Sequence, residues 1–297
     1  SIVANSTRLR CRAAVVYPLI ERITCMNKIP MNENDLKIYE QLRSGGSGYV
    51  ELPRGLFAVW GKESVQFLDG LITNDVKTLE DGAEMLAAFP NAQGRLLALV
   101  RILRQGERFL IETEEATREK LFQNLFRFTF AGDFFVEDLS EQYQYFEILS
   151  GQSEPPALAR GFLPPRDQSE PPALAGGFSF TTGRSIGQFI PTAAASKFRD
   201  DLQKNGSLEL SEDLYETLRI ESGIPKFCID MDENTIVPEL GLDGLISYNK
   251  GCYIGQEIIA RIHFRGHVAK QLTGLMSEPG AVGTGFLPGS DLRTPDG

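Results

Sequence analysis

Residues 250–266 read KGCYIGQEIIARIHFRG, a stretch in which Cys252 follows a Lys-Gly pair and precedes a second glycine. Glycines allow the backbone to turn sharply or to approach a ligand closely. A neighbouring cation, here Lys250, favours the reactive thiolate form of a cysteine. The pattern predicts a functional Cys252 assisted by Lys250. The alternative is that Cys252 is a small buried hydrophobic residue in a turn.

Two histidines, His263 and His267, follow the cysteine and are four residues apart. On a helix, that spacing places two imidazoles on one face, as a zinc site requires. Residues 258–264 alternate apolar and polar, however, which predicts a strand, and there the two residues would be about 13 Å apart. We therefore predict no metal site. An iron–sulfur cluster held by the chain's own cysteines and histidines is disfavoured because the cysteines are not clustered.

The same stretch is locally positive in an acidic chain. The whole sequence has 30 Lys and Arg against 40 Asp and Glu, which argues against a basic surface for nucleic acid. Over residues 249–271, four basic side chains oppose the single acid Glu257. These four are Lys250, Arg261, Arg265 and Lys270. Because arginine forks match carboxylates, we predict that Arg261 and Arg265 bind a small anionic ligand; a solvated surface is the alternative.

Cysteine usage and hydropathy favour a cytoplasmic protein. The four cysteines, at positions 11, 25, 228 and 252, include no C-x-x-C pair and are too few for a disulfide framework. The apolar run at 13–20 is far shorter than the roughly 20 residues of a membrane span. No small-x-small cleavage site follows it, so we expect neither a signal peptide nor a membrane segment.

A repeated segment interrupts the chain. Residues 153–178 read SEPPALARGFLPPRDQSEPPALAGGF, with SEPPALA occurring twice, and a degraded copy lies at 277–289. Paired prolines cannot lie inside a helix or a central strand. We interpret the copies as insertions into surface loops, with docking of a peptide-binding partner as the alternative.

The remaining sequence predicts an α+β fold. Strands are expected at 56–60, 95–103, 108–112, 134–137, 143–149 and 186–190, and helices at 63–72, 114–128, 193–204 and 212–222. Ser211 is a candidate N-cap of the last helix, and Gly223 a candidate residue just past its end. We divide the chain into an arm (1–35), a first α+β module (36–150), the repeat insertion (151–178), a second α+β module (179–270) and an incomplete C-terminal piece (271–297).

Five ordered motifs give the sequence a family resemblance. They are FLDGLITNDV (67–76), NAQGR (91–95), LRIESGIP (218–225), DMDE with PE (230–233 and 238–239) and the Cys252 stretch (250–266). From about residue 56 to residue 275, the chain resembles the folate-binding proteins of the YgfZ type. These proteins are relatives of the aminomethyltransferase, or T-protein, of the glycine cleavage system.

The resemblance implies a T-protein-like fold. Two ferredoxin-like modules would surround a central opening that holds tetrahydrofolate, and a β-barrel would follow. Only one barrel strand, near residues 272–275, precedes the third repeat copy and the last residue, Gly297. We therefore expect a truncated C-terminal barrel and a chain that is a fragment, because a barrel with so few strands has open edges.

The resemblance also suggests which residues contact folate. A carboxylate can accept two hydrogen bonds from the amino-pyrimidinone edge of a pterin, and this gives Glu221 and Glu239 a role. The folate's glutamate tail needs cations, which Arg261 and Arg265 would supply. Gln256, in the same motif as Cys252, completes the predicted folate-binding set.

One departure separates the two branches of the superfamily. Aminomethyltransferases carry an acid on the strand that follows the Gly-rich turn, whereas residues 94–99 read GRLLAL. Methylene transfer then lacks its obvious proton carrier. The KGCY cysteine is, moreover, unusual in the aminomethyltransferase branch.

The resemblance thus implies a tetrahydrofolate-binding protein that acts through Cys252 in iron–sulfur cluster assembly or repair, and so in tRNA modification. Its partners would be iron–sulfur proteins or cluster-assembly factors, without direct nucleic-acid binding. A folate-dependent aminomethyltransferase and a non-enzymatic interaction module acting through the repeats are the alternatives. Whether the protein is an enzyme stays open, with a one-carbon transferase-like activity as the enzymatic option.

Overall fold

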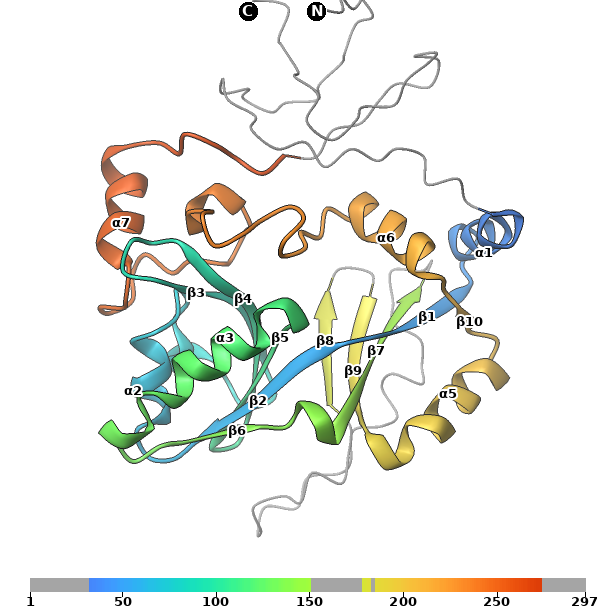
Figure 1. The fold of residues 1–297 in the computed structure, drawn as a ribbon, viewed down its shortest axis with the longest axis horizontal. Helices are drawn as coiled ribbons and strands as arrows, with labels where there is room; N and C mark the ends of the chain where they lie inside the picture. The colour runs from blue at the N-terminus through green and yellow to red at the C-terminus, as the bar shows by residue number, and fades with distance from the viewer. Residues whose placement is uncertain (1–31, 151–177, 183–184, 274–297) are drawn as a thin grey trace, which may run out of the picture.

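The computed structural model describes residues 32–150, 178–182 and 185–273 (Figure 1). The repeat copies at 153–177 and 277–289 lie outside the described residues, as does nearly all of the predicted barrel piece. Helix α1 (Glu33–Arg43) begins inside the range predicted as an arm, with Asn32 as its N-cap. Within the described ranges, no helix is both long and apolar enough to cross a bilayer.

The first sheet, called the β2 sheet below, has the strand order β3-β4-β5-β2-β6. All its neighbouring strands are antiparallel. The strands are β2 (Arg54–Trp60), β3 (Glu84–Pro90), β4 (Leu96–Gln105), β5 (Arg108–Glu114) and β6 (Phe135–Asp138). Helices α2 (Ser64–Asp69) and α3 (Glu115–Phe126) cover one face (Figure 1). Phe57, Val100, Ile111 and Leu121 form part of the apolar core there.

The second sheet, called the β1 sheet, has the order β10-β1-β7-β9-β8. Its strands are β1 (Ser47–Leu52), β7 (Tyr143–Ser150), β8 (Phe178–Thr182), β9 (Ser185–Pro191) and β10 (Leu208–Glu209). Helix α5 (Ala195–Lys204) packs on the face of Tyr49 and Phe146. Helices α1 and α6 (Glu212–Glu221) pack against Val50. Because Tyr49 and Val50 are consecutive in a strand, these two clusters lie on opposite faces.

Two segments cross from one sheet to the other. Only Pro53 separates β1 from β2, and in Figure 1 the two strands form one long ribbon that runs through both sheets. Similarly, β6 is joined to β7 by the short turn η3 (Ser140–Gln142). As a result, β1 and β7, which lie in the predicted module 36–150, pair in the same sheet as β8–β10. The β2 sheet is formed by the continuous segment 54–138, whereas the β1 sheet takes strands from both predicted modules.

The segment after α6 returns to the β2 sheet. It contains the turn η5 (Val237–Leu240) and helix α7 (Gln256–Arg265). Its apolar side chains form a C-terminal cluster against Ala88 and Leu96. This cluster includes Phe227, Val237, Leu240, Leu245, Tyr253 and Ile259.

Helix α7 corrects the strand predicted at 258–264. The apolar residues Ile258 and Ile262 fit both an alternating strand and one turn of a helix. Ile259, which is fully buried, breaks the alternation and is the contact that decides the helix. The predicted start and end of α6 are confirmed, since the Ser211 side chain accepts the Leu214 amide and Gly223 has φ 68°.

Gly187 in β9 provides a test of how the sheets are joined. A Cβ at this position would overlap the hydroxyl of Tyr145 on β7, and that hydroxyl accepts a hydrogen bond from Arg101 of the other sheet at 2.8 Å. Gly187→Ala should displace Tyr145 and lower the free energy of unfolding by about 1–3 kcal/mol, measured by urea denaturation. Gly70→Ala is the control, because its Cβ would have ordinary contacts at 3.6 Å. Equal stability of the two variants would contradict the expected strain.

Candidate functional site

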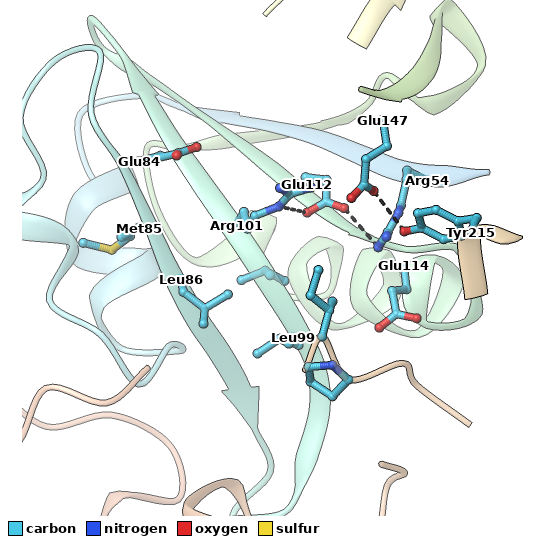
Figure 2. A pocket seen from close by; sticks show the side chains of 13 residues that line it. Arg54, Glu84, Met85, Leu86, Leu99, Arg101, Glu112, Glu114, Glu147 and Tyr215 are labelled. Carbon is cyan, nitrogen blue, oxygen red and sulfur yellow. Dashed lines mark hydrogen bonds and ion pairs between the residues drawn. The ribbon is translucent and has the colours of Figure 1, made fainter. Parts of the chain in front are cut away.

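A cavity of about 320 Å³ lies between the two sheets (Figure 2). Its wall is built from β2, β3, β4, β5, β7 and α6, together with Ile224 and Pro225. The volume is at the lower end of the roughly 300–1,000 Å³ typical of ligand pockets. The cavity is therefore large enough for a small heterocyclic ligand.

One side of the cavity is apolar. In Figure 2, Met85, Leu86 and Leu99 project from β3 and β4, opposite a group of charged side chains. Leu86 and Leu99 also pack against the C-terminal cluster that contains Tyr253. The apolar wall is thus shared with the segment that carries Cys252.

The charged side is centred on Glu112 of β5, which is only 3% exposed. Its carboxylate pairs with Arg101 at 2.8 Å and with Arg54 at 3.2 Å. Burial acts to raise the pKa of Glu112, but the two guanidinium groups outweigh it and lower the pKa. Glu112 is therefore an ionised group whose charge is balanced within the protein.

The β1 sheet contributes a second carboxylate, Glu147 of β7. It accepts hydrogen bonds from Ser185 at 2.7 Å and from the Tyr215 hydroxyl at 3.0 Å. Burial, together with the nearby Glu147, raises the pKa of Tyr215, so this phenol stays a hydrogen-bond donor. Glu147 thus receives its two shortest hydrogen bonds from two elements, β9 and α6.

Glu114, at the end of β5, is the third carboxylate. Both of its oxygens accept the Phe227 amide, at 3.1 Å each. Burial raises the pKa of Glu114, although Arg54 and the Phe227 amide act in the opposite direction. Glu114 is therefore protonated at a higher pH than an ordinary exposed glutamate.

The second part of the site is the loop that carries Cys252. Cys252 is an exposed free thiol, between buried Lys250 and buried Tyr253. The Lys250 side chain is fully buried. Its ammonium donates to three backbone carbonyls, those of Asp69 (2.7 Å), Ile72 (2.9 Å) and Asn74 (2.8 Å). It also pairs with the Asp69 carboxylate at 3.2 Å.

Burial lowers the pKa of Lys250, and the Asp69 carboxylate opposes that effect. All three protons of the ammonium are engaged by segment 69–74, so the structure gives Lys250 an anchoring role. Its predicted influence on the Cys252 thiolate stays a prediction.

Three of the sequence motifs meet at this loop. The Ile254 amide donates to the Gly70 carbonyl at 3.0 Å, in addition to the Lys250 contacts with the 67–76 motif. Gly255 lies against the turn of the 91–95 motif, and a Cβ on it would overlap the Asn91 carbonyl. Gly255 also has φ 81°, which a glycine adopts without strain.

Asn74 connects the Cys252 loop to the cavity wall. Its side-chain amide donates to the carbonyl of Leu86 at 2.9 Å and to that of Gly244 at 2.7 Å. Its own carbonyl accepts the Lys250 ammonium. Leu86 lines the cavity, so the loop and the cavity share one hydrogen-bonded framework.

The two glutamates predicted to bind folate have other partners. Glu221, at the exposed end of α6, accepts a hydrogen bond from Tyr39 of α1 at 2.8 Å. Glu239 accepts the Ile236 amide at 2.9 Å and so caps the η5 turn. Burial raises the pKa of Glu239, while the Ile236 amide and Arg95 oppose that shift. Neither glutamate lines the cavity.

The remaining predicted residues lie on α7. Gln256 donates to the Gly251 carbonyl at 3.3 Å, inside the Cys252 loop. Arg261 forms an exposed pair with Glu257 at 2.8 Å, and Arg265 is also exposed. His263 stacks on Tyr248 with ring centroids 3.6 Å apart. Among the described residues, no group of three or more His, Cys, Asp and Glu side chains is placed to hold a metal.

The charged residues of the cavity were not predicted from the sequence. Two signals could have identified them. Glu112 and Glu114 are two residues apart, so both face the same side if the strand predicted at 108–112 is extended to residue 114, where β5 ends. Arg101 is a charge inside the apolar strand 95–103, which calls for a buried partner.

Comparisons with known proteins agree with the motifs. The chain is 29% identical over 240 residues to "Iron-sulfur cluster assembly factor IBA57 homolog, mitochondrial" of Mycosarcoma maydis, covering 75% of this chain and 55% of that protein. It is 28% identical over 217 residues to "tRNA-modifying protein YgfZ" of Escherichia coli O157:H7, covering 71% and 66%. The aminomethyltransferase T of the glycine cleavage system from Bartonella henselae has a similar structure. The TM-score is 0.64 at 18% identity, over 78% of this chain and 67% of that one.

These similarities support the resemblance to the YgfZ-type, T-protein-like family. No protein-family model matches the chain. The predicted α+β, T-protein-like fold is confirmed. The chain spans 55% and 66% of the length of the two curated relatives.

Lys250 should be essential for the stability of the chain. Lys250→Met keeps the aliphatic stem but leaves three carbonyls and one Asp69 oxygen without their donor. Breaking a buried charge pair in this way costs about 3–5 kcal/mol, which urea denaturation would measure. Lys77→Met is the matched control, because Lys77 pairs with the other Asp69 oxygen at 2.6 Å from a half-exposed position. A Lys250 variant as stable as the Lys77 variant would refute the anchoring role.

Proposed function

We propose that this chain binds tetrahydrofolate in the cavity between the sheets and supports iron–sulfur cluster assembly or repair through Cys252. The observation that carries the proposal is the connection of an exposed thiol to a ligand-sized cavity through Lys250 and Asn74. The names of the two curated relatives, a cluster assembly factor and a tRNA-modifying protein, support the same role.

The cavity residues fit a folate. Carboxylates on the charged side suit a heterocycle that is rich in N–H donors, and the apolar side suits the flat faces of its rings. The cavity takes the heterocycle, and the glutamate tail extends outside it. Arg261, Arg265 and Gln256 on α7 are the proposed contacts of the tail. Glu221 and Glu239, the pterin contacts that the resemblance suggested, do not line this cavity, and each has a protein partner.

Cys252 is the proposed reactive residue. A thiolate is the ligand that iron–sulfur clusters prefer, and the exposed loop presents this thiol to a partner protein. The cluster is cargo here, and iron–sulfur proteins or cluster-assembly factors are the proposed partners. Bound tetrahydrofolate would supply one-carbon chemistry or protection of the thiol. Lys250 and Gly255 hold the loop in place while Cys252 reacts.

A folate-dependent aminomethyltransferase is the second candidate. The sequence argument against it was the missing acid at residues 94–99. In the cavity, carboxyl groups come from β5 instead, at Glu112 and Glu114. A glycine cleavage assay with aminomethylated carrier protein and tetrahydrofolate distinguishes the two candidates. The interaction-module alternative concerns repeats that lie outside the described residues.

The cytoplasmic location stays a prediction, because one relative is named as mitochondrial and the other is bacterial.

Cys252 can be tested against a second exposed thiol, Cys228. In cells that lack their own YgfZ-type protein, Cys252→Ser should fail to restore the activity of cluster-containing enzymes. Cys228→Ser should restore that activity fully. Both variants should bind tetrahydrofolate as the unmodified chain does. Full rescue by Cys252→Ser would exclude the thiol mechanism.

The place of the ligand can be tested by filling the cavity. Leu99→Trp adds a large ring at the half-buried apolar wall and should weaken tetrahydrofolate binding about tenfold or more, measured by calorimetry. Leu36→Trp is the control, because Leu36 is 46% exposed on α1 and away from the cavity lining. Unchanged affinity in a folded Leu99→Trp variant would show that folate binds elsewhere.

A further inference from the structure

The carboxylates of Glu112, Glu147 and Glu114, which line the cavity, differ in how many hydrogen-bond donors they already have. A carboxylate offers about four acceptor positions. Glu112 is held between two guanidinium groups, from Arg54 and Arg101. Glu147 accepts from Ser185 and from the Tyr215 hydroxyl, with Tyr145 further away at 3.5 Å. These two carboxylates are engaged by the protein itself.

Glu114 is different. Within the part of the chain that the structure describes, its hydrogen-bond donor is the single Phe227 amide, shared between both oxygens at 3.1 Å. Both oxygens therefore keep lone pairs for a further donor. Figure 2 shows the Glu114 carboxylate on the cavity wall, below Arg54 and Tyr215.

The charges that face Glu114 nearly cancel. Arg54 on β2 and Arg101 on β4 are balanced by Glu112 on β5 and Glu147 on β7. The other charged and titratable groups around the cavity are Glu84 on β3 and Tyr215 and Arg219 on α6.

Arg219 is itself paired with Asp230 at 2.7 Å and with Glu216 at 2.5 Å. Little net positive charge is left to hold Glu114 ionised, and burial raises its pKa. In the ligand-free protein, the Glu114 carboxyl is therefore protonated more readily than a glutamate in water.

We propose that Glu114 is the ligand-recognising acid of the cavity. Its carboxylate accepts hydrogen bonds from adjacent N–H groups of a nitrogen heterocycle, and it loses its proton to solvent as the ligand binds. The inference rests on the proposed function in taking tetrahydrofolate as the ligand. It moves the acceptor of the pterin edge from Glu221 and Glu239, which have partners outside the cavity lining, to Glu114.

The proton balance is simple. Below the pH at which Glu114 ionises in the free protein, the carboxylic acid and the ligand give the carboxylate–ligand complex and one proton in solution. Affinity should then rise with pH until Glu114 is ionised in the free protein, and level off above that pH. The two N–H donors on the ligand and the Phe227 amide together satisfy the carboxylate.

Calorimetric titration of tetrahydrofolate between about pH 5 and pH 7.5 tests the proposal. Each titration is run in two buffers with different ionisation enthalpies, so that proton release is counted directly. The unmodified chain should release a proton at the acidic end and bind more tightly as the pH rises. Glu114→Gln, which keeps an acceptor for Phe227, should bind about tenfold to hundredfold more weakly and release no proton.

The matched control is Glu115→Gln. Glu115 is the next residue in the chain, is exposed, and pairs with Arg118 at 3.6 Å outside the cavity. This variant should bind and release protons as the unmodified chain does. A carbon NMR titration of the Glu114 carboxyl in the unmodified chain gives a readout that does not depend on any variant. Its midpoint should move to lower pH when ligand is bound.

The outcomes separate this inference from the proposed function. If the unmodified chain binds tetrahydrofolate and Glu114→Gln binds it equally well with the same proton release, Glu114 is not the acceptor and the inference is wrong. If tetrahydrofolate does not bind but 2-amino-4-hydroxypteridine does, in a manner that needs Glu114, the inference stands and the folate assignment is wrong. Binding of neither compound overturns both.

Discussion

The paired charges of Glu112 with Arg54 and Arg101 are the interaction on which the cavity depends. Two apolar sheet faces would pack together and close the space between them. Here the facing surfaces carry charged side chains that keep their ion pairs only in the observed geometry. Arg101 also donates a hydrogen bond to Tyr145 on the other sheet. Removing one partner would leave a buried charge without compensation, at a cost of about 3–5 kcal/mol. The network thus fixes the separation of the sheets as well as their alignment.

The crossing strands make this arrangement a property of the whole chain. Because β1 continues into β2 through Pro53, Arg54 stands where the chain passes from one sheet to the other. The cavity wall is therefore assembled from strands that are distant in sequence. The β1 sheet cannot be completed from one continuous segment, because β1 precedes all the strands of the β2 sheet and β7 follows them. Long-range pairings of this kind form late and slowly in folding.

Sequence patterns predicted features that depend on neighbouring residues, such as helix ends, and missed those that depend on contacts between distant segments. The Ser211 cap and the helix that follows were predicted correctly because every signal lies within a dozen residues. Periodicity failed at Ile258 and Ile262, where strand and helix spacing coincide and only the burial of Ile259 decides.

The sheet that β1 and β7 join could not be read from the sequence, since pairing partners are not encoded in a strand's own pattern. The carboxylates predicted from the sequence were likewise identified from local motifs and not from their contacts in the fold. Glu239 was singled out by its motif but has a local capping partner, whereas Glu114 became a candidate only when the fold placed it in a cavity.

The buried ammonium of Lys250 has a consequence for when the thiol becomes available. The three carbonyls that receive it resemble the oxygen cage of a monovalent cation site, except that the cation is tethered to the chain and does not have to be captured from solution. The cage exists only after segment 69–74 has taken its final shape. Cys252 therefore reaches its exposed position beside Lys250 only in the finished fold, so the same contacts that stabilise the chain also decide when this thiol is presented to solvent.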